Sequence, residues 1–191
     1  MAEKKGQMFR FRAVDKAIWE DLVKLFESRG GPSYCWCMVW RPKPVGASKW
    51  PKNERKRMLR AQLHDLVSNG VPVGIIAYHE QTPVGWCSVA PRSTFKKLGG
   101  PENGEEDENR IWSITCFFVK RAYRGRGLFS GLLDAAVSTA RDRDARVIEA
   151  YPVDGDSPSY RFMGFVESFR NAGFVEVGRA GSRRYVMRLS V

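Results

Sequence analysis

Residues 119–131 read Val119-Lys120-Arg121-Ala122-Tyr123-Arg124-Gly125-Arg126-Gly127-Leu128-Phe129-Ser130-Gly131, and this stretch decides the fold. It joins a strongly β-prone run, Ile111 to Val119, to apolar residues at helical spacing from Leu128 to about Arg141. The glycines allow a tight turn whose backbone approaches a ligand closely, and the first N–H groups of the helix have no partner within it. The order strand, glycine turn, helix therefore predicts a site for an anion such as pyrophosphate.

The glycine turn does not by itself identify the ligand. Rossmann and P-loop turns hold phosphates by the same physics, but their full spacings, G-x-G-x-x-G and G-x-x-x-x-G-K-[ST], do not occur here. The turn alone predicts a phosphate-bearing ligand at a strand-to-helix connection and nothing narrower.

The rest of the chain supplies strands and helices on both sides of this turn. Met8 to Val14 alternates apolar and charged residues as a half-buried strand does, and Asp15 stands where a helix N-cap would. Two apolar runs joined by residues 79–83 indicate a β-hairpin. The expected helices are 16–28, 53–69, 128–141 and 162–171, and the expected strands are 8–14, 73–78, 84–90, 111–119, 146–153, 175–177 and 185–189.

This order of elements predicts an α/β chain with a mixed, mostly antiparallel sheet and helices on both faces. The early strands pair as hairpins, and a later strand crosses through a helix to the next strand. A length of 191 residues favours a single domain, 1–191. We expect an ordered aromatic and basic loop at about 32–52 and a mobile, acid-rich loop at about 99–109.

The composition is typical of a folded cytoplasmic protein. Hydrophobic residues make up 43% of the chain, no apolar run reaches the roughly 18 to 20 residues of a membrane span, and the N-terminus has no apolar signal core. Four cysteines are too few for a disulfide scaffold, which fits a reducing compartment. We expect no membrane partner, and a monomer or a homodimer.

A net charge of +11 attracts polyanions, among them a phosphate-bearing cofactor. Much of this charge lies in a basic strip between Arg41 and Arg60, where Glu54 is the single acid. The strip consists of Arg41, Lys43, Lys49, Lys52, Arg55, Lys56, Arg57 and Arg60. It is interpreted either as a solvated helix face or, with Trp40 and Trp50 interleaved, as a surface for nucleic acid.

Val119 followed by Arg124-Gly125-Arg126-Gly127 resembles the acetyl-CoA signature [RQ]-x-x-G-x-[GA] of the GNAT family of N-acetyltransferases. The first four positions match, whereas the sixth is Phe129 where a small residue is usual. The strand before the turn resembles the family's fourth strand, and Phe169-Arg170-Asn171-Ala172-Gly173-Phe174 resembles the [YF]-x-x-x-G-F ending of its last helix. The resemblance covers about residues 70 to 190 and implies the GNAT acyltransferase fold.

The resemblance also implies where acetyl-CoA binds. In this family, main-chain groups of the fourth strand hold the pantetheine arm, and a β-bulge splays that strand from the fifth. Carried over by position, those main-chain groups belong to Phe117, Phe118 and Val119. The pyrophosphate would be held by the N–H groups of Gly125, Arg126, Gly127, Leu128, Phe129 and Ser130. The side chains of Arg124 and Arg126 would add charge-assisted hydrogen bonds to phosphates.

Direct transfer of acetyl to a primary amine requires a base or a water chain that removes the amine proton, because a lysine-like amine has a pKa of about 10.4. We favour Glu149 as this base, and the alternatives for it are a solvent-facing carboxylate on a strand or an ion-pair partner. The other carboxylates expected near the site are Asp154, Asp156 and Glu167. The family's usual proton donor is a tyrosine, but Phe169 stands at that position. Tyr160 is therefore the candidate donor to the departing thiolate, with water as the alternative.

Other functions stay open from the residues alone. The acceptor amine belongs to a small molecule or to a peptide. A basic nucleic-acid-associated module is the rival class, and a non-catalytic acyl-CoA-binding sensor is made conceivable by Phe169. Trp36, Trp40 and Trp50 either pack in the core or line a substrate pocket under the 32–52 loop.

The pair Cys35-x-Cys37 does not predict a metal site. Only two histidines, His64 and His79, exist to complete one, and no second close cysteine pair follows. A nucleophilic cysteine would need a base and an orienting partner nearby, which the sequence does not place. We therefore expect acetyl-CoA as the co-substrate and no metal.

Overall fold

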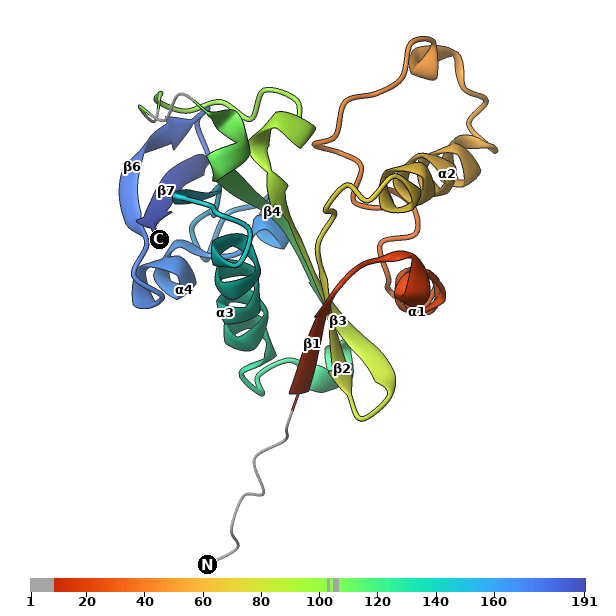
Figure 1. Ribbon diagram of the computed structural model, residues 1–191, viewed down its shortest axis with the longest axis horizontal. Helices are drawn as coiled ribbons and strands as arrows, with labels where there is room; N and C mark the ends of the chain where they lie inside the picture. The colour runs from red at the N-terminus through yellow and green to blue at the C-terminus, as the bar shows by residue number, and fades with distance from the viewer. Residues whose placement is uncertain (1–8, 103, 105–106) are drawn as a thin grey trace, which may run out of the picture.

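The computed structural model describes residues 9–102, 104 and 107–191. In this part of the chain, seven strands form one sheet in the order β1-β2-β3-β4-β5-β7-β6 (Figure 1). The strands are β1 (Phe9–Ala13), β2 (Ile75–His79), β3 (Thr82–Pro91), β4 (Ile111–Val119), β5 (Val147–Ala150), β6 (Val175–Ala180) and β7 (Arg184–Ser190). Among the described pairs only β4–β5 is parallel, so the predicted mixed, mostly antiparallel sheet is confirmed.

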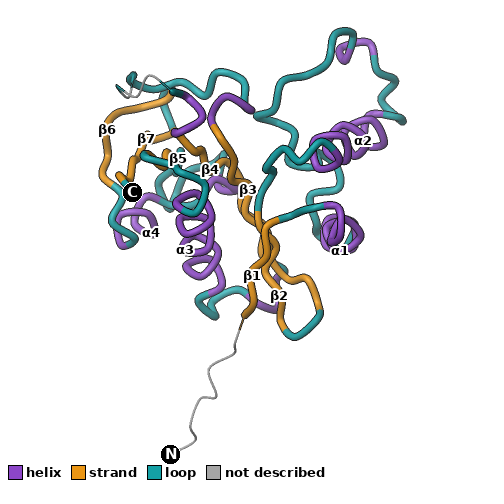
Figure 2. The backbone as a smooth tube through the Cα atoms, in the orientation of Figure 1, coloured by secondary structure: helices purple, strands orange, loops and turns teal. Residues whose placement is uncertain are grey.

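Helices cover both faces of this sheet, as predicted. They are α1 (Trp19–Phe26), α2 (Arg55–Ser68), α3 (Leu128–Arg141) and α4 (Val166–Asn171). Figures 1 and 2 show α3 and α4 on one side of the sheet and α1 and α2 on the other. No described helix has the length and apolar character needed to cross a bilayer.

Strand alternation directs side chains of the central strands into two apolar layers on opposite faces of the sheet. Along β3, Cys87 and Val89 pack in the layer that also contains Leu132 of α3, while Trp86, which directly precedes Cys87, faces the layer with Leu22 of α1 and Leu63 of α2. Both layers bury their residues almost completely. The two helix pairs are thus held on opposite faces by the period-two pattern of the strands.

Local sequence signals explain where several elements begin and end. The Asp15 side chain accepts a hydrogen bond from the Ile18 N–H at 3.2 Å, which confirms it as the N-cap of the first helical segment. Gly70 follows α2 with a φ of 72°, the left-handed conformation that ends a helix. The last helix was predicted four residues too early, because Arg161–Met163 forms a 3-10 turn and Gly164, with a φ of 90°, interrupts it.

β4 and β5 part after a short stretch of pairing. Their register runs from Ile111↔Val147 to Ile114↔Ala150, and the remainder of β4 pairs with β3 alone. In the β3–β4 pairing, Thr115 is the additional residue, because the partners of Val89 and Ser88 are Ile114 and Cys116. This β-bulge bends β4 away from β5 and agrees with the splayed strand that the resemblance implied. β5 is correspondingly shorter than the predicted 146–153.

The predicted mobile loop at 99–109 lies partly outside the described residues, since 103, 105 and 106 are not described. Its first part is tied to β7, where the Arg188 guanidinium donates to the carbonyl oxygens of Pro101 and Glu102. The mobility of the loop stays a prediction.

Candidate functional site

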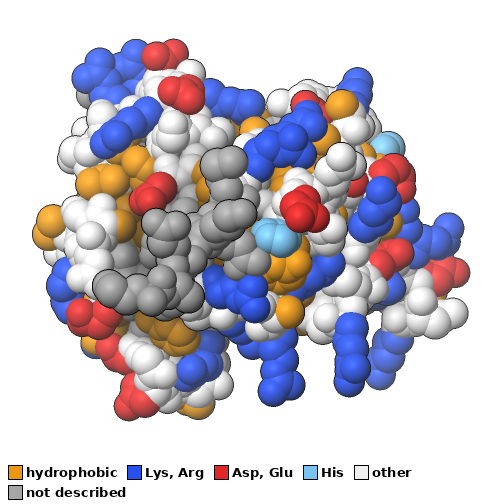
Figure 3. All heavy atoms as spheres, turned by 90° about the horizontal axis from the view of Figure 1, so that it is seen from below, with side chains coloured by type: hydrophobic (Ala, Val, Ile, Leu, Met, Phe, Trp, Pro, Cys, Tyr) orange, Lys and Arg blue, Asp and Glu red, His pale blue; other side chains and the backbone are white. Residues whose placement is uncertain are grey.

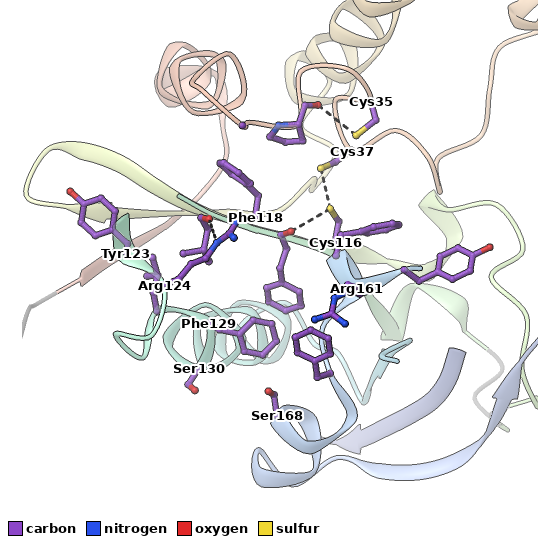
Figure 4. A pocket seen from close by; sticks show the side chains of 18 of the residues that line it. Cys35, Cys37, Cys116, Phe118, Tyr123, Arg124, Phe129, Ser130, Arg161 and Ser168 are labelled. Atoms are coloured by element: carbon purple, nitrogen blue, oxygen red, sulfur yellow. Dashed lines mark hydrogen bonds between the residues drawn. The ribbon is translucent and has the colours of Figure 1, made fainter. Parts of the chain in front are cut away.

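A cavity of about 860 Å³ opens where β4 parts from β5 (Figure 4). This volume is within the usual range for ligand sites, about 300–1,000 Å³. The walls come from four segments: the loop after α1, the second half of β4, the glycine turn with the start of α3, and residues 160–168. The cavity is lined by nine of the ten residues predicted to bind the cofactor, namely Phe117, Phe118, Val119, Arg124, Gly125, Gly127, Leu128, Phe129 and Ser130.

The second half of β4 presents main-chain groups to this cavity. The Lys120 N–H bonds back to the Val84 carbonyl of β3 at 2.9 Å. Because successive residues of a strand point to opposite edges, the main-chain groups of Val119 and Phe117 face away from β3. The Val119 carbonyl already accepts a hydrogen bond from Arg124 Nε at 3.1 Å. The N–H groups of Phe117 and Val119 are therefore the clearest donors for a ligand lying along this edge.

The glycine turn brings the start of α3 to the same edge. Gly125 and Gly127 have φ angles of 70° and 77°, which side-chain-bearing residues rarely adopt. A Cβ added at either glycine would meet no described atom within 4 Å, so the space outside the turn is open. The first helical hydrogen bond runs from the Gly131 N–H to the Gly127 carbonyl. The N–H groups of residues 128–130 therefore have no acceptor within the helix and are free to bind an anion.

The two arginines of the turn are placed differently. Arg124 lines the cavity while its Nε holds the Val119 carbonyl. The Arg126 guanidinium instead lies 5.7 Å from the ring centroid of Tyr123 and is not part of the cavity wall. A phosphate contact by the Arg124 side chain fits this geometry, whereas one by Arg126 stays a prediction without support from its position.

An aromatic cluster fills the space beneath the cavity. The ring of Phe129 lies 4.3 Å from that of Phe117 and 6.1 Å from that of Phe169. Gly164 permits this packing, because a Cβ there would come within 2.7 Å of the Phe169 ring and 3.0 Å of the Phe129 ring. Phe169 has no exposed surface and does not line the cavity. The position of the family's usual tyrosine is thus occupied by a buried packing residue.

Tyr160, the candidate proton donor, does line the cavity. Its side chain lies near Trp40 and Phe162, with ring centroids 6.2 Å away in both cases, and it is 36% exposed. Its φ of 59° is left-handed, which is uncommon for a residue with a side chain. The phenol therefore stands at the mouth of the cavity and is open to a ligand.

Glu149, the candidate base, lies away from the cavity. Its carboxylate is completely buried and bonds to Arg92 Nη1 at 2.5 Å, to Arg188 Nε at 2.8 Å and to the hydroxyl of Tyr151. Burial and the neighbouring carboxylate raise the pKa of Tyr151, so its phenol stays protonated and donates. Of the two alternatives to a base, the solvent-facing carboxylate is wrong, because Glu149 is buried, and the ion-pair partner matches its geometry.

The other candidate carboxylates also lie outside the cavity. Asp154 accepts a hydrogen bond from the Tyr185 hydroxyl at 3.1 Å, Asp156 is exposed, and Glu167 pairs with Arg170 on the surface. Among the described residues that line the cavity, none is an aspartate or a glutamate.

The loop after α1 forms the roof of the cavity and uses its tryptophans in different ways. Trp36 is buried against Trp19, with ring centroids 6.0 Å apart, and Trp50 packs at the edge of the same apolar layer. Trp40 alone of the three lines the cavity. The two predicted roles, core packing and pocket lining, are therefore divided among these residues.

Cys35, Cys37 and Cys116 also line the cavity (Figure 4). The Sγ atoms of Cys37 and Cys116 are 3.3 Å apart. Hydrogen bonding to Cys116 and burial raise the pKa of the Cys37 thiol well above its ordinary range. This thiol is protonated at neutral pH and is not an activated nucleophile. No group of His, Cys, Asp and Glu in the described chain could hold a metal ion.

Arg41 does not belong to the exposed basic strip in which the sequence analysis placed it. It is 2% exposed, its guanidinium lies 4.0 Å from the Phe95 ring centroid, and it donates to the Pro72 carbonyl at 3.3 Å. Burial lowers its pKa to about 10, so it remains charged and anchors the roof loop to the sheet.

Several other residues of the strip are paired with acids. Lys56 and Arg60 lie 3.8 and 3.4 Å from Glu27, and Arg57 lies 2.7 Å from Glu54. Figure 3 shows Lys and Arg side chains interspersed with acidic ones on the side where α1 and α2 lie. This mixture of signs fits a solvated helix face.

Arg161 and Ser168 both line the cavity but were not predicted from the sequence. Ser168 directly precedes the buried Phe169, and neighbours on a helix differ by about 100° in direction, so the helical period offered a signal. Arg161 carried no such signal, because its position depends on the irregular path of residues 151–165.

The chain resembles known proteins in sequence and in fold. A sequence profile described as the acetyltransferase (GNAT) family matches residues 38–165. Among solved structures, the PaiA N-acetyltransferase of Thermoplasma acidophilum, determined in complex with coenzyme A, has a TM-score of 0.55 at 14% identity, covering 96% of this chain and 99% of its own. No curated protein sequence matches this chain.

Two further structures show the same fold. The ribosomal-protein-alanine N-acetyltransferase of Brucella melitensis has a TM-score of 0.54 at 20% identity, covering 95% of this chain and 99% of its own. The GNAT domain of S. lividans PAT has a TM-score of 0.56 at 19% identity, covering 96% of this chain and 90% of its own. Likeness at these identities shows a shared fold and leaves the acceptor undetermined.

Proposed function

Because the chain belongs to the acetyltransferase (GNAT) family, we propose that it moves the acetyl group of acetyl-CoA directly to a primary amine within the cavity beside β4. The observation that carries this proposal is the junction of two ligand-binding features. The edge of β4 offers main-chain donors to an extended pantetheine arm, and the start of α3 offers unpaired N–H groups to a pyrophosphate. The glycine turn between them leaves open space for the cofactor.

Each part of the cofactor has candidate partners in this chain. The N–H groups of Phe117 and Val119 bind the pantetheine arm, and those of the turn and the first residues of α3 bind the pyrophosphate. The Arg124 side chain adds positive charge beside the phosphates. Phe118 takes part only through its place in the strand, since its side chain packs against the α1 and α2 layer.

Bound acetyl-CoA supplies an activated acyl group. A bond forms between the amine nitrogen and the acetyl carbon, the carbon–sulfur bond breaks, the nitrogen loses a proton and the sulfur gains one. Main-chain N–H groups along β4 stabilise the negative charge that develops on the carbonyl oxygen. Tyr160 is the candidate donor of the proton, because it lines the cavity beside Trp40 and is partly exposed.

No described carboxylate is placed to remove the amine proton. The acceptor therefore binds as a neutral amine or loses its proton to water. The four cysteines form no disulfide, which fits a cytoplasmic location for the reaction.

The proposal is tested by measuring acetyl-CoA binding calorimetrically and then following thiol release across pooled amines, antibiotics and peptides. Binding with turnover supports the proposal. Binding without turnover on any acceptor would point to the acyl-CoA sensor. No binding at millimolar acetyl-CoA, together with salt-sensitive binding of DNA or RNA, would instead support a nucleic-acid-associated module.

A further inference from the structure

The cavity has a second end that the proposed cofactor does not need. If acetyl-CoA lies along β4 and the α3 turn, as proposed above, the remaining walls surround the acceptor. We call this part the acceptor end, and it is lined by Tyr34, Cys35, Val39, Trp40, Tyr160, Arg161 and Phe162. In Figure 4, Cys35 and Arg161 lie across the cavity from Tyr123 and Arg124. The acceptor end is thus built mainly from aromatic and apolar surface.

The acceptor end contains positive charge and no described negative charge. Arg161 lines it, and its guanidinium points into the cavity in Figure 4. Its Nη1 atom donates to the carbonyl oxygens of Gly155 at 2.5 Å and Ser157 at 3.3 Å, and it pairs with no described carboxylate. These carbonyls hold the guanidinium in place without neutralising its charge.

A second guanidinium lies behind the wall of the acceptor end. Arg184 stacks 4.5 Å from the Trp40 ring centroid and 5.5 Å from that of Tyr160. Its Nη1 atom is buried and has no hydrogen-bond partner among the described residues. Lys96 adds a third cation, 5.1 Å from the same Trp40 ring. The thiol of Cys35 is protonated, because hydrogen bonding to Cys37 and burial raise its pKa, so it does not offset these charges.

We propose that the acceptor is an amine with an aromatic or apolar body that also carries an anionic group, bound with that group toward Arg161. The rings of Trp40, Tyr160 and Phe162 provide surface for the body, and a guanidinium is the preferred partner of a carboxylate or phosphate. A polycation is a poor fit, because each ammonium group would lose water and approach fixed guanidinium groups with no acid to balance it. This excludes polyamines, polycationic antibiotics and lysine-rich peptides as preferred acceptors.

Three amines of matched chemistry test the proposal: 4-(aminomethyl)benzoate, benzylamine and spermidine. Thiol release from acetyl-CoA is measured with each, using the full chain at mildly alkaline pH, where part of each amine is neutral. We expect the highest kcat/KM for 4-(aminomethyl)benzoate and the lowest for spermidine. A preference for spermidine, or failure of both aromatic amines to react, would overturn the proposal.

Arg161→Ala tests how the anionic group is recognised. Loss of one charge-assisted hydrogen bond should raise KM for 4-(aminomethyl)benzoate about 10- to 100-fold and leave KM for benzylamine nearly unchanged. Arg161→Lys should restore part of the difference. Arg170→Ala is the control, because Arg170 lies outside the cavity and pairs with Glu167. An equal change for both aromatic amines would mean that Arg161 has a structural role, and the proposal would be wrong.

Acetyl-CoA binding measured on the same samples separates this inference from the proposed function. If acetyl-CoA binds and the preferred acceptor is a polycation, the proposed acceptor class is wrong and the acetyltransferase proposal still holds. Absence of binding would overturn both.

Discussion

Phe129 and Phe169 meet edge to face, with ring centroids 6.1 Å apart and an interplanar angle of 85°. These two residues are the points where the chain departs from the family signature, one replacing a small residue and the other a tyrosine. Because the two rings are in contact, the two unusual residues pack together in one aromatic cluster. The large Phe129 side chain occupies space beside position 169. Because Gly164 has no side chain, both rings fit against its backbone.

Phe169→Tyr restores the residue type usual in the family, but we expect no gain in activity. The ring of Phe169 is completely buried among Phe117, Phe129 and Phe174. An added hydroxyl without a hydrogen-bond partner costs about 1–3 kcal/mol. Urea unfolding should show a loss of that size, and kcat should not increase. A tenfold rise in kcat would show instead that the hydroxyl reaches the departing sulfur.

Gly127→Glu should abolish acetyl-CoA binding while the domain stays folded. The new side chain projects into open space and places a negative charge where the pyrophosphate is proposed to bind. Gly181→Glu is a matched control, since Gly181 has a φ of 80°, close to the 77° of Gly127, and is equally unobstructed. Backbone strain should lower the stability of both variants by the same amount, about 1–2 kcal/mol.

Calorimetry with acetyl-CoA and thermal unfolding distinguish the two effects of this substitution. The thermal midpoints of the two variants should fall alike, and only Gly127→Glu should lose binding. Equal affinity in both variants would place the phosphates elsewhere.

Tyr160→Phe tests proton donation at the mouth of the cavity. Removing the phenol should lower kcat about 10²- to 10⁴-fold, the usual range for a general acid, with little change in acetyl-CoA affinity. Ser168→Ala provides the comparison, because Ser168 carries another hydroxyl that lines the cavity, next to the aromatic cluster. If Ser168→Ala slows the reaction and Tyr160→Phe does not, the assignment of the donor moves to Ser168.

Glu149→Gln should act on stability and not on acetyl transfer. The substitution leaves Arg92 and Arg188, which are 17% and 14% exposed, without their counter-charge. Breaking a buried pair in this way costs about 3–5 kcal/mol. Glu167→Gln, at an exposed pair, should cost at most about 1 kcal/mol. A large fall in kcat with unchanged stability would restore Glu149 as the base.

The sequence predicted those parts of the fold and site that depend on short-range pattern. The glycine turn, the α3 helix and the N-cap at Asp15 are local, so their residues alone determine them. The roles weighed for Glu149 could not be separated in this way, because its partners Arg92 and Arg188 come from distant segments. The β5–β7 register places Glu149 opposite Arg188, and Arg92 reaches the same carboxylate from the 3-10 turn that follows β3.

The irregular segments were the least predictable parts. Arg41 resembles its basic neighbours in sequence, yet the roof loop turns it into the core against Phe95. Arg161 reaches the cavity only because residues 151–165 follow a path set by tertiary contacts, including the bridge between Val153 and Phe165. In such segments a residue's neighbours in space are not its neighbours in sequence, so periodicity gives no information.

The buried thiols predict a loss of stability at alkaline pH. Burial raises the pKa of Cys87, and hydrogen bonding to Cys116 with burial raises that of Cys37, so both stay protonated in the folded protein. In the unfolded chain a thiol ionises with a pKa of about 8.5. Above that pH the unfolded state binds fewer protons than the folded state, and its relative free energy falls.

The stability that these thiols contribute is thus fully present below about pH 8.5 and is lost as the pH rises, by about 1.4 kcal/mol per pH unit for each thiol. Urea unfolding at a series of pH values measures this slope. Cys87→Ala should reduce this slope by about the contribution of one thiol, because the variant lacks the titrating group of residue 87. Val89→Ala is the control, since Val89 is buried in the same strand and layer but does not titrate, so it should lower stability at every pH and leave the slope unchanged. An unaltered slope in Cys87→Ala would mean that its thiol ionises alike in both states.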